Sequence, residues 1–208
     1  MKHRLRRPRG GSALAVAAIV AVCLLIGSAA GAPTVRQHLS PVAAGQGIYM
    51  TIGSCPGSGT SICGDSTAPG HTGAMILASV SFKGTTPATA GGPSGPVRFD
   101  DLTVDKSADP GSAPLLTRLA TGARVGPVVV SFDRPGPTGA PVTVLRYTIN
   151  PAVVTSYSLS TDTSGHTEHM TMAVGAVKIE YWAIGPDGIV RPIGSFCWSV
   201  TTNSPTCP

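Results

Sequence analysis

The chain has 208 residues, with 15 lysines and arginines against 10 aspartates and glutamates, and a formal net charge of +5 at pH 7. Five of the basic residues lie within residues 2–9, so the rest of the chain carries equal numbers of basic and acidic side chains. The basic balance is therefore no evidence for nucleic-acid binding, and we expect no nucleic-acid partner, because no excess of positive charge remains outside the N-terminal segment.

The N-terminal segment has the order of a secretory signal peptide. Its basic residues precede an apolar run of 14 residues, Ala13 to Ile26, and small residues follow that run. A membrane-spanning helix needs about 20 apolar residues, so the run is short for an anchor. We expect cleavage near Ala30 or Ala32, a secreted location, and no membrane association after cleavage. Residues 31–46 are small and polar, which predicts a flexible arm.

Four cysteines follow the leader: Cys55, Cys63, Cys197 and Cys207. An even number of cysteines in an exported chain predicts two disulfides, for which three pairings are possible. The spacings favour the two local loops, Cys55–Cys63 and Cys197–Cys207. A bridge between the two regions stays open if the chain ends meet.

The composition favours an all-β protein with many turns. The chain holds 26 glycines and 19 prolines, and only 12% of its residues are charged. Before the middle of the chain we expect strands at 47–52, 74–82 and 97–104, where apolar and polar residues alternate. A long loop at 53–73 separates the first two strands. A second loop, 83–96, has almost no apolar content and should project from the domain.

A short helix is predicted at 112–121. The Ser112 hydroxyl can accept a hydrogen bond from an exposed amide at the N-terminus, and Gly122 provides the stop. Leu115, Leu116 and Leu119 are expected to form one apolar stripe. Because so short a helix is not stable alone in water, it must pack against a sheet.

In the second half of the chain, apolar and polar residues alternate with a period of two, which predicts further strands. Polar turns at 134–141 and 161–165 and a glycine at 175 separate them. The C-terminal residues Phe196, Trp198 and Val200 alternate and predict one more strand. Closely spaced strands without long intervening helices are typical of a β-sandwich or barrel. The expected strands are 128–133, 144–149, 153–159, 170–174 and 177–183.

No catalytic, metal or cofactor site is predicted. His166 and His169 are three residues apart, so on a strand they point to opposite faces and cannot chelate one ion together. Asp100 and Asp101 are adjacent and would also face oppositely, which excludes a paired acid and base. No serine lies in a Gly-x-Ser-x-Gly motif. We expect no small-molecule substrate.

One alternative from another class is an exported hydrolase or glycan-binding protein on a β-sandwich. Such a site would need polar side chains from several loop tips to lie close together. No rule of sequence spacing relates the polar residues that are available for it. For His71, a hydrogen bond to Asp65 or to a carbonyl oxygen is the expected role. The five candidates are His71, Asp65, Asp133, Arg134 and His166.

Several segments in a fixed order carry a family resemblance. They are the helix region 105–122, the strand 128–134, the strands within 147–159, and the closing strand 175–181 with the sequence GAVKIEY. Upstream, the loop and strand within 64–82 fit the same order. Over roughly residues 47–184 the chain resembles the Hcp family, the tube proteins of type VI secretion systems.

The resemblance implies a mainly β fold, a small β-barrel of two packed sheets with one short flanking helix. It also implies self-association into hexameric rings, a structural role without catalytic residues, and ring contacts through the loop that matches 83–96. The implied contact residues are Lys83, Thr85, Thr86, Pro93 and Pro96.

We therefore expect a signal peptide at 1–30, an arm at 31–46, an Hcp-like barrel at 47–184 and a cysteine-containing extension at 185–208. The leader and the cysteines favour a secreted location, and the resemblance implies a non-enzymatic structural or protein-interaction module. Its partner would be a further copy of itself or another protein.

Overall fold

The computed structural model describes residues 46–55, 61–163 and 165–208. The predicted signal peptide and all but the last residue of the predicted arm lie outside these residues. Within the described ranges, no helix has the length and apolar content to cross a membrane.

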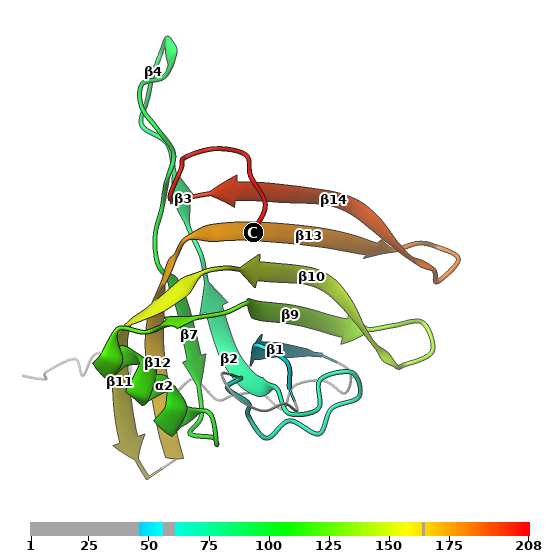
Figure 1. The fold of residues 1–208 in the computed structure, drawn as a ribbon. Coiled ribbons are helices and arrows are strands. Elements are labelled where there is room, and N and C mark those ends of the chain that lie inside the picture. Colours follow the sequence, from blue (N-terminus) through cyan, green and yellow to red (C-terminus); the bar gives the residue numbers. More distant parts are fainter. Residues whose placement is uncertain (1–45, 56–60, 164) are drawn as a thin grey trace, which may run out of the picture. The chain divides into compact units, whose positions relative to one another are not determined.

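A ten-stranded antiparallel sheet and one short helix form the body of the described chain (Figure 1). The sheet follows from the alternating segments of the sequence, which put one apolar row of each strand toward the core. The elements are β1 (Gly47–Ile52), β2 (Met75–Ser81), β7 (Leu102–Lys106), α2 (Ser112–Thr121), β8 (Arg124–Val125), β9 (Val128–Pro135), β10 (Pro141–Ile149), β11 (Ala152–Asp162), β12 (Gly165–Val174), β13 (Ala176–Ile184) and β14 (Val190–Ser199).

The strands form one continuous hydrogen-bonded order, β14-β13-β10-β9-β1-β2-β7-β12-β11-β8. Among the described residues, the end strands β14 and β8 are not paired with each other, so hydrogen bonds do not close the sheet. The mainly β fold and the single short helix agree with the prediction. The two-sheet closed barrel does not appear in the strand pairing.

The sheet nevertheless folds over one core. We call β14, β13, β10, β9 and β1 the first half-sheet and the remaining five strands the second half-sheet. Short connections lead from β8 to β9, from β10 to β11 and from β12 to β13, and each passes from one half to the other. Apolar side chains from both halves therefore join one buried cluster.

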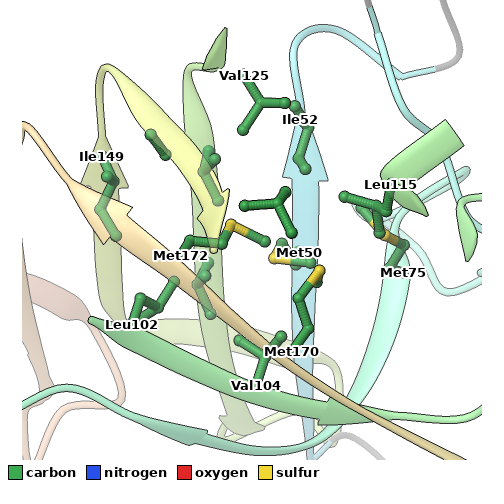
Figure 2. Close-up of a cluster of buried hydrophobic side chains, with 14 of the residues drawn as sticks. Met50, Ile52, Met75, Leu102, Val104, Leu115, Val125, Ile149, Met170 and Met172 are labelled. Carbon is green, nitrogen blue, oxygen red and sulfur yellow. The ribbon is translucent and has the colours of Figure 1, made fainter. Parts of the chain in front are cut away.

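Methionines fill the centre of this cluster. Met50, Met170 and Met172 point toward one another, while Met75 lies beside Leu115 of the helix (Figure 2). The unbranched methionine side chain adapts to irregular space between curved strands, which suits a sheet that bends over itself. Met170 and Met172 of β12 are therefore core residues.

The segment predicted as the loop 83–96 is a narrow projecting hairpin (Figure 1). Its base is the pair β3 (Gly84–Thr85) and β6 (Arg98–Phe99), and its tip is the pair β4 (Ala88–Thr89) and β5 (Gly92–Pro93). The segment projects as the sequence predicted, but the prediction of a loop without strands was wrong. The predicted strand 97–104 also breaks at Asp100 and Asp101, where β6 of the hairpin ends before β7 begins.

Helix α2 has the predicted bounds, and Gly122 ends it with the left-handed φ of 61°. One detail of the prediction was wrong. Leu116 does not belong to the apolar stripe, because its side chain is 42% exposed whereas Leu115 is fully buried. Gly111 is the N-cap residue, and the Ser112 hydroxyl accepts a hydrogen bond from the amide of Asp109 just before the helix.

The structure places the cysteine sulfurs at disulfide distance in the two local pairs that the spacing favours. Cys55 and Cys63 lie 2.09 Å apart, and Cys197 and Cys207 lie 1.94 Å apart. The second pair holds the C-terminal residues beside β14. That strand lies in the predicted extension, yet it is paired along β13 and continues the main sheet.

Candidate functional site

The hairpin presents four of the five predicted contact residues to solvent. Thr85, Thr86 and Pro96 are exposed, and Pro93 lies in β5. The Lys83 side chain is 68% exposed and lies 3.9 Å from Asp100, a weak surface ion pair. A projecting element with no core of its own is held by its base alone, which leaves its tip available for contacts with another molecule.

Aromatic rings connect the base of the hairpin to the edge of the sheet. The rings of Phe82 and Phe99 are stacked at 5.4 Å, and Phe99 lies 6.2 Å from Phe196 of β14. Phe196, Ile193 and Tyr181 are themselves largely exposed around this edge. Apolar side chains that reach solvent next to a projecting element are typical of an interaction surface.

A buried ionic network lies where α2 begins. Lys106, at the end of β7, is only 1% exposed, and its ammonium lies 2.7 Å from Glu168 of β12 and 2.8 Å from Asp109. It also donates to the Ser112 hydroxyl at 2.9 Å. A buried charge is stable only when it is paired and hydrogen-bonded, and this lysine meets both conditions.

The network fixes the helix to the sheet. The Ser112 hydroxyl donates to Glu168 and accepts from the amide of Asp109, while the Asp109 carboxylate accepts from the amide of Gly111. The Tyr157 hydroxyl of β11 donates to the other Glu168 oxygen at 2.5 Å. Strands β7, β11 and β12 are therefore linked to the first turn of α2 by polar contacts as well as by packing.

The network also sets two pKa values. Burial alone would raise the pKa of the Glu168 carboxyl, but the hydrogen bonds from Lys106, Tyr157 and Ser112 outweigh it and hold this pKa below its ordinary value of 4.5. Burial, together with the hydrogen bond to Glu168, raises the pKa of Tyr157 to about 12. The charged form of Glu168 and the neutral form of Tyr157 are therefore the forms that stabilise the fold.

These pKa values predict two pH limits of stability. Because the pKa of Glu168 is lowered in the folded state, its contribution is present above 4.5 and is lost as the pH falls through the folded-state pKa. Because the pKa of Tyr157 is raised, its contribution is present below 10.0 and is lost as the pH rises toward about 12. Denaturant unfolding followed by circular dichroism across this pH range measures both.

The variant Tyr157→Phe separates this network from other titrating groups. It removes one donor to Glu168, so the acid limit should move to higher pH, and the loss of stability between 10 and 12 should become smaller. An acid limit at the same pH in Tyr157→Phe and in the unaltered chain would contradict the assignment.

A second polar contact joins residues that are far apart in the sequence. The His71 ring nitrogen Nε2 lies 2.8 Å from the Asp133 carboxylate, and Thr143 donates to the other Asp133 oxygen at 2.8 Å. The His71 ring stacks on Tyr49 at 4.1 Å. The predicted hydrogen bond between His71 and Asp65 was therefore wrong. Burial, and then the Asp133 carboxylate, raise the pKa of Tyr49.

The structure does not bring the five candidates of the alternative function together. Asp65, Asp133 and Arg134 line one open groove of about 1150 Å³, with His71 hydrogen-bonded to Asp133 from beside it. His166 lies elsewhere, at the tip of the β11–β12 hairpin, where its ring is 3.0 Å from the Thr161 hydroxyl. In the described part of the chain, no serine, threonine or cysteine side chain is hydrogen-bonded to His71.

Another serine, aspartate and histidine meet on the outer face of the second half-sheet. The Asp105 carboxylate accepts from Ser79 at 2.5 Å and lies 2.6 Å from Nδ1 of His169. Here the carboxylate lies between the other two groups, whereas in a catalytic triad the histidine does, since it must take the serine proton. These contacts therefore bind β2, β7 and β12 to one another and activate no nucleophile.

The fold and its surfaces define a class of protein: a mainly β structural module with a projecting hairpin and a helix fixed by a buried ionic network. The family model "Type VI secretion system effector, Hcp" matches residues 49–183, more than half of the chain. The chain belongs to the Hcp family. The match ends inside β13, so β14 and the C-terminal cysteine pair lie beyond it.

Solved structures of the family share the fold. A type six secretion system protein has a TM-score of 0.67 and 20% identity, over 76% of this chain and 98% of that one. Hcp1 from Salmonella typhimurium has a TM-score of 0.60 and 21% identity, over 76% and 97%. A type VI secretion system effector from Yersinia pestis has a TM-score of 0.57 and 14% identity, over 74% and 99%. The comparison with curated proteins found no match.

Proposed function

We propose that this protein is an exported, non-enzymatic member of the Hcp family that assembles into hexameric rings. The observation that supports this most is the extent of the likeness, because the chain covers nearly the whole length of its solved relatives. The signal-peptide-like N-terminus and the two local cysteine pairs favour a secreted location, where disulfides persist.

The projecting hairpin is the proposed ring contact. Its exposed residues include the polar Thr85, Thr86 and Thr89, and its base adjoins the exposed apolar side chains of the β14 edge. A polar rim around an apolar centre is the usual composition of a protein–protein interface.

The assembly is tested by exporting the chain through its own leader and measuring the mass of the purified product by light scattering after gel filtration. We expect a mass six times that of the mature chain and ring-shaped particles in electron micrographs. A product that remains monomeric at high micromolar concentration would overturn the proposal.

A shortened hairpin tests the proposed contact. Thr85 and Arg98 are direct partners in the β3–β6 pair, so residues 86–97 can be replaced by an Asn-Gly turn that suits a two-residue hairpin. We expect the core and the thermal unfolding transition to remain and the hexamer to be lost. The control is Thr138→Arg, which adds bulk at the exposed β9–β10 turn and should leave the hexamer intact.

A further inference from the structure

A polar pocket lies on the outer face of the first half-sheet, on the side opposite the core. Its volume is about 330 Å³, at the lower end of the range found for small-molecule sites. Strands β1, β9, β10 and β13 form its floor, and the loop that carries Gly70 and His71 forms one wall. The family likeness assigns no role to this pocket.

The strand register arranges the floor as two rows of side chains. Ser131 is the direct partner of both Tyr49 and Arg146, and Arg146 is the partner of Glu180, so these four residues form one row across the sheet. The next row contains Thr51 and Thr148 on either side of Val129. Side chains two residues apart on one strand share a face, so both rows point into the pocket.

Arg146 is the group in this pocket whose hydrogen-bonding capacity is unused. Its guanidinium carbon lies 5.3 Å from the centre of the Trp182 ring, which supports one face of the group. Within the described residues, the guanidinium forms no hydrogen bond or ion pair, and its N–H donors stay free. The hydroxyls of Thr51, Ser131 and Thr148 likewise have no hydrogen-bond partner in the described chain.

The acidic groups nearby are already paired. Glu180 lies 2.7 Å from the Lys178 ammonium, and Asp133 is bound by His71. Arg146 therefore supplies an uncompensated positive charge inside a half-buried pocket lined with hydroxyl donors. A planar guanidinium matches the two oxygens of a carboxylate, while the hydroxyls can donate to the same oxygens.

We infer that this pocket binds the carboxylate of a small organic acid through Arg146. Among the described residues that line the pocket, Arg146 offers the one unpaired positive charge, which balances one negative charge of the ligand, so a monoanion is preferred over a phosphate dianion. The free carboxylate takes the N–H donors of Arg146, and the hydroxyls of Thr148 and Ser131 complete its hydrogen bonds. This inference does not depend on ring assembly.

Saturation-transfer NMR on the ligand tests the inference, because it observes binding to a monomer and to a ring alike. The full exported chain is titrated with acetate, with chloride replacing it at equal ionic strength, and in a second arm inorganic phosphate, which has no carbon-bound protons to observe, is added as a competitor of the acetate signal. We expect saturable acetate binding and weaker phosphate binding. Absence of saturable acetate binding, or phosphate binding as tight as that of acetate, would overturn the inference.

Variants locate the bound carboxylate. Arg146→Gln should weaken acetate binding by about tenfold or more, the usual size of one lost charged hydrogen bond. Thr148→Val, which keeps the side-chain shape, should weaken it less. The control Arg124→Gln removes an exposed positive charge on β8, in the other half-sheet, and should leave the affinity unchanged. Equal affinities in Arg146→Gln and Arg124→Gln, with both variants folded by circular dichroism, would place the site elsewhere.

Discussion

Replacement of Lys106 by methionine should cost about 3–5 kcal/mol of unfolding free energy. The substitution keeps a long, unbranched side chain but removes the ammonium that pairs with Glu168 and Asp109. Both carboxylates would then be buried without a counter-charge, and the Ser112 hydroxyl would lose one donor. Since domains of this size have a total stability of roughly 5–15 kcal/mol, the loss is large. Urea unfolding with the disulfides intact measures it.

Two controls show that the cost comes from the burial of the network. Lys83→Met removes an exposed lysine whose partner Asp100 is 3.9 Å away, and should change stability by no more than about 1 kcal/mol. Adding Glu168→Gln to Lys106→Met removes one uncompensated carboxylate, so the double variant should be more stable than the single effects predict. If Lys106→Met and Lys83→Met cost the same, the network does not hold the helix.

The alternation of apolar and polar residues predicted most of the sheet and also contained the signal for the buried network. Lys106 continues the inward row of Leu102 and Val104, and Glu168 precedes Met170 and Met172 in the same phase. Period-two spacing therefore places a lysine and a glutamate on the buried face. A charged residue considered by itself is taken as the end of an apolar strand pattern. For that reason the predicted strands 97–104 and 170–174 did not include Lys106 and Glu168.

Contacts that depend on loop closure could not be predicted in the same way. His71 and Asp133 are separated by 62 residues, and no spacing rule relates a loop residue to a strand that is distant in the sequence. The alternation within β9 places Asp133 on the face of the sheet that points away from the core, yet this carboxylate is buried. The loop that follows Cys63 and carries His71 covers it, and Ile62, just before this loop, forms a bridge with Ile52 of β1.

The sequence also could not predict which strands, β14 and β8, lie at the two ends of the sheet. The pattern that marks a strand does not say which strand it pairs with, so a closed barrel and an open, folded sheet share the same alternation. The C-terminal alternation predicted β14, but its pairing with β13 follows from the connecting turn and the nearby cysteine pair. The surfaces proposed for assembly thus depend on tertiary pairing.

Leu115→Ala should destabilise the chain by about 2–5 kcal/mol, the cost of removing a fully buried leucine and leaving a cavity. Leu115 is the residue through which α2 enters the core beside Met75 (Figure 2). A helix this short depends on tertiary packing, so loss of this contact should release α2 as well. Denaturant unfolding measures the free energy, and amide exchange in residues 112–121 reports the opening of the helix.

The neighbouring leucine provides the matched control. Leu116→Ala removes the same atoms from a side chain that is largely exposed, and should change stability by about 0.5 kcal/mol or less. A difference of several fold between the two variants would show that packing on one face holds α2. Equal costs would mean that the helix is held by the Lys106 network alone, and in that case Lys106→Met should open residues 112–121 by itself.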